Sequence, residues 1–159
     1  TYPCEGTDQP GTEIVFSQNF PTNSGLGKIV PTNIISPDEL PDQNFPFVLT
    51  TGRLLEHWHT GSMTRKSETL DKIEPEAIVS MNSQDMNFLK LEPGNKVTVK
   101  TRRGSVTLSV RQDRELPKGM IFIPFCFSEA AANKLTNPQL DPYGKIPEFK
   151  YCAANIEAC

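Results

Sequence analysis

Hydrophobic positions along the chain form short runs separated by glycine, proline and polar residues. The run Phe-Val-Leu at 47–49 follows a proline and precedes Gly52, so residues 47–51 are predicted to form a buried strand. Residues 77–81, Ala-Ile-Val-Ser-Met, predict a second strand. Asn82 or Ser83 can then cap a short helix over 84–89, with its apolar side chains directed toward the sheet: Met86, Phe88 and Leu89.

Polar and apolar residues alternate on both sides of a turn in the second half of the chain. Residues 96–101 and 106–110 show this alternation, and Arg102-Arg103-Gly104 lies between them, which predicts a β-hairpin. The inward positions are Val97, Val99, Val106, Leu108 and Val110. The apolar run 120–125 predicts a central strand.

The rest of the chain predicts one helix and one strand. Residues 128–135 are rich in alanine and predict a helix capped by Ser128, and residues 151–156 predict a last strand. Many short strands with one or two short helices indicate a mainly β domain. Closure into a small barrel would leave no exposed strand edges.

Proline divides the chain into two parts. Of the 14 prolines, half fall within the first 46 residues, which predicts an extended, proline-rich lead-in over 1–45 that lies on a partner or on the domain itself. Residues 46–159 are long enough for one domain with its own core. The first and last residues, Thr1 and Cys159, suggest that the chain is a fragment of a longer catalytic subunit.

Composition excludes several classes of protein. A net charge of −3 gives no electrostatic basis for binding nucleic acid. No apolar run approaches the roughly 20 residues that membrane insertion requires. The four cysteines lack Cys-x-x-Cys spacing, so we expect neither a zinc nor an iron–sulfur site, and interpret them as free, mostly buried thiols: Cys4, Cys126, Cys152 and Cys159.

Residues 51–60, Thr-Gly-Arg-Leu-Leu-Glu-His-Trp-His-Thr, place many polar side chains directly after a buried strand. Backbone amides, a guanidinium and ring donors suit an anionic, planar ligand such as a nucleotide-like cofactor. In an extended segment His57 and His59 would point to the same side. With no third histidine, a metal is the weakest interpretation; binding of a polyanion and hydrogen bonding within a packed turn remain as alternatives.

Other candidate residues differ in how strongly they indicate function. Arg53 follows the buried strand directly and is a candidate ligand contact, whereas Arg65 and Lys66 are expected on a solvated face. The arginines at 102 and 103 are expected to solubilise a hairpin tip, with Gly104 present for its backbone conformation. Asn133 and Lys150 are weaker candidates for ligand contacts. The sequence has no nucleophile motif, and Asp141 and Glu148 are too loosely spaced to indicate an acid–base pair.

Five segments together resemble a known family. They are residues 51–65, the hairpin signature within 91–104, Pro124-Phe125, the stretch Glu-Ala-Ala-Ala-Asn with its continuation over 129–137, and residues 140–153, which include Lys-Ile-Pro-Glu-Phe-Lys. The chain resembles the C-terminal dinucleotide-binding domain of molybdopterin oxidoreductases over about residues 45–157. The later motifs are most similar to formate dehydrogenase α subunits, and nitrate reductases share the His-Trp-His-Thr-Gly block.

This resemblance implies a mainly β fold with short helices, the double-psi β-barrel of the aspartate-decarboxylase-like type. It also implies bis(molybdopterin guanine dinucleotide) with molybdenum or tungsten, shared with domains outside this sequence, and a 4Fe-4S cluster in the parent protein alone. Phe125 would lie near a substrate funnel. The residues expected to bind the cofactor are Thr51, Gly52, Arg53, Leu54, Leu55, Glu56, His57, Trp58, His59, Thr60, Asn133 and Lys150.

The resulting hypothesis is a cofactor-binding domain with no catalytic residue and no metal ligand of its own. The parent would oxidise formate to CO₂, and this fragment alone would be inactive. Its partners would be the N-terminal and central domains of the same polypeptide, together with electron-transfer subunits. The cytoplasm is the expected compartment and the periplasm the alternative. A nitrate reductase domain and a stand-alone barrel that uses the His-Trp-His turn as a protein contact remain as alternatives.

Overall fold

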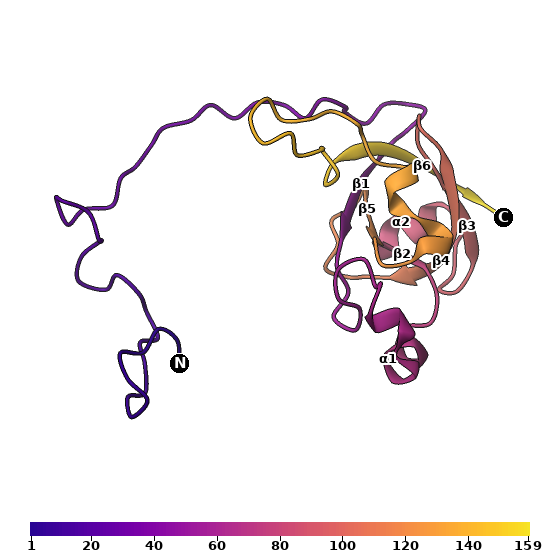
Figure 1. Cartoon of the computed structure of the whole chain (residues 1–159). Helices are drawn as coiled ribbons and strands as arrows, with labels where there is room; N and C mark the ends of the chain where they lie inside the picture. Colours follow the sequence, from indigo (N-terminus) through magenta and orange to yellow (C-terminus); the bar gives the residue numbers. More distant parts are fainter. The chain divides into compact units, whose positions relative to one another are not determined.

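The computed structural model describes residues 1–159, and six of its segments form strands that close into one barrel (Figure 1). The strand order is β1-β5-β2-β4-β3-β6. β1 pairs in parallel with β5, and β2 pairs in parallel with β4, while the other pairs are antiparallel. The strands are β1 Phe47–Gly52, β2 Ile78–Met81, β3 Lys96–Lys100, β4 Ser105–Gln112, β5 Met120–Pro124 and β6 Cys152–Ala158.

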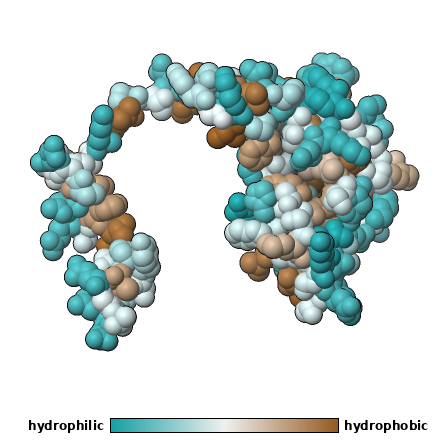
Figure 2. Space-filling view, viewed as in Figure 1, coloured by the Kyte–Doolittle hydropathy of each residue, from teal (hydrophilic) through white to brown (hydrophobic).

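Alternating side chains of these strands fill the barrel, as the sequence predicts. In the β3–β4 hairpin Val99 lies opposite Val106 and Val97 opposite Leu108, and all four are buried. β5 confirms the strand predicted over 120–125, and it lies between β1 and β2; in a closed barrel every strand has two neighbours, so no strand is more central than another. With the aliphatic side chains inside, most of the barrel surface visible in Figure 2 is hydrophilic.

Short helices connect the strands: η1 Thr64–Lys66, α1 Glu68–Ile73, α2 Ser83–Phe88, η2 Ser128–Ala130 and η3 Ala132–Lys134. The Asn82 side chain caps α2 by accepting from the backbone N–H of Gln84 at 2.8 Å. Met86 is buried and Leu89 is packed against the core, but Phe88 is 83% exposed, so its predicted orientation was wrong. A helix this short buries one stripe, and Phe88 lies on the opposite side from Met86.

The single helix predicted over 128–135 was also wrong. Ala131 has an extended backbone (φ −61°, ψ 110°) and separates two 3-10 turns, and Ser128 forms no capping hydrogen bond. Ala132 and Leu135 are buried. Burial of these side chains against the barrel outweighs the helix propensity of alanine.

The arginines at the hairpin tip are neither an anion site nor a solvated pair. Glu39 accepts hydrogen bonds from the Arg103 guanidinium and, at 2.7 Å, from the Ala153 amide, and Arg102 pairs with both Glu39 and Asp42. We call Glu39, Asp42, Arg102 and Arg103 the hairpin clamp. It fastens the segment before β1 to the barrel. Three ion pairs, all with partners far along the chain, explain why the solvated prediction failed.

Gly104 serves close packing rather than an unusual backbone angle. A Cβ there would lie 3.0 Å from the Lys134 carbonyl oxygen, and its φ is not in the left-handed region. The predicted reason for this glycine was therefore wrong.

Compactness divides the chain into Thr1–Ile35 and Ser36–Cys159, earlier than the boundary that the prolines suggested. The first unit has no helix or strand, and within it the Phe16 and Phe20 rings stack at 5.5 Å. No helix of the structure has the length and apolar character needed to cross a membrane.

Candidate functional site

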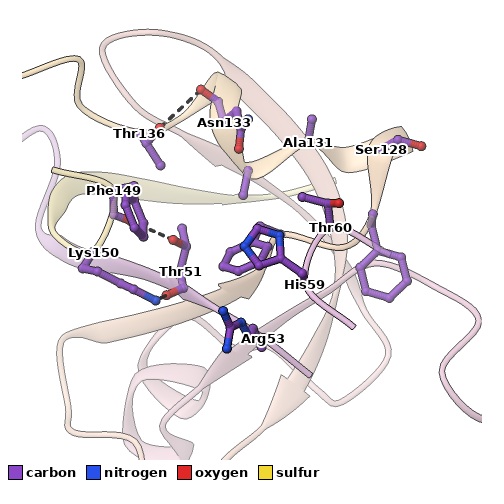
Figure 3. Close-up of a pocket in the computed structure, with 13 residues that line it drawn as sticks. Thr51, Arg53, His59, Thr60, Ser128, Ala131, Asn133, Thr136, Phe149 and Lys150 are labelled. Carbon is purple, nitrogen blue, oxygen red and sulfur yellow. Dashed lines mark hydrogen bonds between the residues drawn. The ribbon is translucent and has the colours of Figure 1, made fainter. Parts of the chain in front are cut away.

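A cavity of about 700 Å³ opens where β1 ends (Figure 3). Its walls come from the end of β1, the turn that follows it, the loop after β5 and the residues before β6. The lining residues are Thr51, Arg53, His59, Thr60, Phe125, Phe127, Ser128, Ala131, Ala132, Asn133, Thr136, Phe149 and Lys150. Ligand-binding cavities in proteins commonly have this size and this mixture of aromatic and polar walls.

The structure brings together seven of the predicted ligand contacts from three distant parts of the sequence: Thr51, Arg53, His59, Thr60, Phe125, Asn133 and Lys150. The other six do not line the cavity: Gly52, Leu54, Leu55, Glu56, His57 and Trp58. The predicted segment 51–60 therefore lines the cavity with its two ends, and its middle does not contribute.

Two cations face this cavity without a carboxylate partner. Arg53 lies 5.5 Å from the Trp58 ring, and the Lys150 ammonium donates to the Thr51 carbonyl at 2.5 Å. The ion pairs of the chain involve other arginines and lysines. No aspartate or glutamate lines the cavity, so its fixed charge is positive.

β1 and the loop before β6 hold each other at the cavity edge. Thr51 donates its hydroxyl to the Phe149 carbonyl at 2.7 Å, while Lys150 returns a bond to Thr51. The Lys150 ammonium also lies 5.8 Å from the Phe125 ring and 5.4 Å from the Phe149 ring. These contacts fix the side chain at the wall before any ligand binds.

The two histidines do not face one ligand, contrary to the expectation from alternation. His57 is fully buried; its Nε2 donates to the Glu74 carbonyl at 2.8 Å, and its ring meets Phe127 edge-on. His59, labelled in Figure 3, is exposed. Its ring packs on Phe125 with ring centroids 5.3 Å apart. His59 has a φ of 51°, and this left-handed residue ends the extended pattern on which the expectation rested.

The buried Nδ1 of His57 has no hydrogen-bond partner. Because Nε2 faces a carbonyl, which can only accept, Nε2 carries the proton in this hydrogen bond. The contacts of His57 are those of a packed turn, the second of the alternatives above.

The glycines of this segment allow the protein to pack on itself. A Cβ at Gly52 would lie 2.6 Å from the Phe122 ring, and a Cβ at Gly61 would lie 2.7 Å from the Cys126 carbonyl oxygen. Arg65 was predicted to lie on a solvated face, and this was wrong: its guanidinium pairs with Asp71 and Glu129.

Sequence reasoning missed six lining residues: Phe127, Ser128, Ala131, Ala132, Thr136 and Phe149. Their place near Asn133 and Lys150 was a usable signal. Cys126 lies in the sequence between Phe125 and Phe127, which both line the cavity, and burial raises the pKa of its thiol to about 11. This thiol is therefore not a nucleophile at neutral pH.

The donor set fits an anionic ligand with a planar part. Arg53 and Lys150 can bind phosphate oxygens, the Asn133 amide and the threonine hydroxyls can bind polar ring edges, and aromatic side chains provide flat contact surface. Because no acidic side chain opposes it, the ligand can carry several negative charges.

The chain matches a family model described as the Molydopterin dinucleotide binding domain over residues 47–153. The chain belongs to this family. The match covers strands β1 to β5, the start of β6 and every lining residue of the cavity, so the resemblance seen in the sequence is confirmed. The closed, mainly β barrel is the expected fold.

Two curated relatives of this molybdopterin dinucleotide-binding chain are both named as alpha subunits of F420-dependent formate dehydrogenases. It is 44% identical over 156 residues to the F420-dependent formate dehydrogenase subunit alpha of Methanocaldococcus jannaschii. It is 41% identical over 156 residues to the F420-dependent formate dehydrogenase 1 subunit alpha of Methanococcus maripaludis. Each alignment covers 98% of this chain but 23% of the relative, so the chain spans about a quarter of their length.

Among solved structures, acetylene hydratase from Pelobacter acetylenicus is similar with a TM-score of 0.66 and 20% identity. The similarity covers 72% of this chain and 18% of the hydratase. At this identity the likeness concerns the fold alone.

Proposed function

We propose that this chain is the C-terminal cofactor-binding domain of a formate dehydrogenase α subunit, and that its cavity holds part of bis(molybdopterin guanine dinucleotide). The observation that carries the proposal is the cavity after β1, with Arg53 and Lys150 free of carboxylates and no acidic residue in its wall. The formate dehydrogenase names of the relatives support the choice of substrate.

The residues divide according to the chemistry of the dinucleotide. Arg53 and Lys150 would bind the pyrophosphate, because a guanidinium and an ammonium both suit phosphate oxygens. Asn133, Thr51 and Thr60 would bind polar edges. His59 and Phe125 form a wall on which a planar group can lie, with Phe125 toward the substrate funnel.

The cofactor, when bound, would supply the two-electron redox chemistry through its molybdenum or tungsten. This chain would hold it, orient it and set the local charge. The metal ligand and the 4Fe-4S cluster would come from the N-terminal and central domains of the parent, which are also the main partners. Electron-transfer subunits would accept the electrons, and we propose the cytoplasm as the compartment.

A test of the substrate uses the full-length polypeptide purified without oxygen. We expect formate-dependent reduction of a viologen dye, bound pterin dinucleotide, and either molybdenum or tungsten by mass spectrometry. Turnover of nitrate without turnover of formate would assign the domain to a nitrate reductase instead. The absence of a cysteine cluster in the several hundred residues before Thr1 would contradict the iron–sulfur part of the proposal.

A further inference from the structure

The turn over residues 58–61 has a backbone that its sequence does not favour. The Gly61 amide donates to the Trp58 carbonyl at 2.9 Å and closes the turn. Within it His59 has a φ of 51°, a left-handed conformation that costs free energy for any residue with a Cβ. Glycine would adopt it without strain, yet the chain has a histidine whose ring lines the cavity.

Such strain persists only where neighbouring contacts hold the backbone in place. Three contacts hold this turn. Gly61 packs against the Cys126 backbone so closely that a Cβ would lie 2.7 Å from its carbonyl oxygen. The Thr64 hydroxyl accepts from the Trp58 amide at 3.0 Å, and the Arg65 amide donates to the Gly61 carbonyl at 2.9 Å.

The Arg65 side chain joins this turn to the neighbouring loop after β5, because its Cγ lies beside Gly61, 2.7 Å from the position that a Cβ on this glycine would take. Its guanidinium binds Asp71 at 2.5 Å and Glu129 at 3.0 Å, and lies 4.6 Å from the centre of the Phe127 ring. Phe127 lines the cavity, and Glu129 directly follows Ser128, which also lines it. One side chain therefore links the strained turn to the loop after β5.

We propose that Arg65 is a positioning residue for the cofactor cavity: it holds the 58–61 turn in its left-handed form, so that the His59 ring faces the ligand. Arg65 touches no ligand itself. The value of this arrangement for the cofactor rests on the proposed function above, but the mechanical link between Arg65 and the turn does not.

The hairpin clamp provides a closely matched control. Arg102 also binds two carboxylates, those of Glu39 and Asp42, and lies 4.7 Å from the Phe45 ring. It is somewhat more exposed than Arg65, at 40% against 23% of the side chain. It has no contact with the 58–61 turn, so Arg102→Ala removes similar interactions without releasing His59.

The first test compares His59→Ala with His59→Gly in three backgrounds of this chain by urea unfolding: unchanged, Arg65→Ala and Arg102→Ala. At ordinary loop positions alanine is more stable than glycine, but a left-handed residue reverses this order. In the unchanged and Arg102→Ala backgrounds, we expect the unfolding constant of His59→Ala to exceed that of His59→Gly by about fivefold.

In the Arg65→Ala background the turn can leave its left-handed form, so the preference for glycine should disappear or reverse. If the fivefold preference persists there, the turn does not depend on Arg65 and the proposal is overturned. Arg65→Lys is the second variant if the alanine variant does not fold. It keeps the charge but loses the planar fork, and should change the preference in the same direction.

The second test measures the pterin dinucleotide retained by the full-length polypeptide after gel filtration. We expect Arg65→Ala to lower retention several-fold and Arg102→Ala to leave it unchanged. Lost coupling at position 59 with full retention would support the Arg65 link and count against the cofactor role of His59. Equal losses in both arginine variants would overturn the positioning role.

Discussion

The hairpin clamp and the cavity use cations in opposite ways. In the clamp, Arg102 and Arg103 each bind the carboxylate of Glu39, and Asp42 binds Arg102 as well. In the cavity, Arg53 and Lys150 face open space with aromatic rings beside them and no carboxylate in the wall. The first pair of cations is satisfied by the chain itself, and the second is not.

This difference separates residues that stabilise the fold from residues available to a ligand. Where a cation is paired with a carboxylate of the same chain, removing either partner destabilises the fold, because the remaining charge is left desolvated and unpaired. A cation at an open wall contributes little to folding, but it attracts an anion strongly when the site closes around it. Changes in the two regions should therefore affect different measurements.

The largest effect is expected from Arg53→Ala combined with Lys150→Ala in the full-length polypeptide. Each charged hydrogen bond to a phosphate contributes on the order of 1.5–3 kcal/mol, so their joint loss should lower dinucleotide retention about 100-fold or more. Pterin released by oxidation and measured by fluorescence reports the loss. The urea midpoint of the cofactor-free protein should change little.

The same double variant can break the comparison. If retention is unchanged, the cavity cations do not bind the cofactor, and a role of the His-Trp-His turn in protein contact becomes the better interpretation. If the urea midpoint of the cofactor-free protein falls clearly along with retention, the two cations stabilise the fold, and the contrast with the hairpin clamp is lost.

The strands of the barrel could be predicted from the sequence, because each follows from the pattern of neighbouring residues. Alternation in 96–101 and 106–110 predicted the β3–β4 hairpin and its buried valines, and an apolar run predicted β5. Propensity failed in 128–135, where packing of Ala132 and Leu135 divides the helix. Local pattern also gave no sign of α1, which has no buried residue and therefore no hydrophobic stripe.

The candidate site was harder to predict, because the contacts that position its side chains join residues far apart in the sequence. Arg103 and Glu39 are 64 residues apart, as are Arg65 and Glu129, so neither pair is visible as a motif. The separation of His57 from His59 was equally invisible as a motif, because the chain bends over residues 55–57 and turns left-handed at His59. What the sequence did indicate was the unusual density of polar residues after β1, and Arg53 among them.

The next effect in size is expected from Glu39→Ala in the hairpin clamp. The change removes the acceptor of the Ala153 amide and leaves the Arg103 guanidinium, 22% exposed, with the Leu135 carbonyl as its remaining acceptor. Because Ala153 is fully buried but the Arg103 guanidinium keeps some contact with solvent, we expect a loss of about 2 kcal/mol in the free energy of unfolding, less than for a fully buried ion pair. Urea unfolding at neutral pH measures it.

Asp42→Ala is the control for this loss. Asp42 is 44% exposed and binds Arg102 alone among the clamp arginines, so its removal should change stability far less than removal of Glu39. Equal losses would show that the clamp acts through general surface charge. Dinucleotide retention should remain unchanged in both variants.

The smallest expected effect is a pH dependence that belongs to the clamp and not to the cavity. Burial raises the pKa of Glu39, but hydrogen bonds from Arg103 and the Ala153 amide, with the charges of both arginines, outweigh it and hold the pKa below its ordinary value of 4.5. The ionised carboxylate therefore stabilises the fold above that value, and this contribution is lost as pH falls through the lowered pKa. The unfolding free energy should decrease on acidification more steeply for the unchanged chain than for Glu39→Gln, until the difference between the two proteins closes. Other carboxylates with lowered pKa values, such as Glu76, are present in both proteins, so their contributions cancel in this comparison. Parallel pH profiles of the two proteins would therefore show that Glu39 does not titrate as the clamp geometry requires.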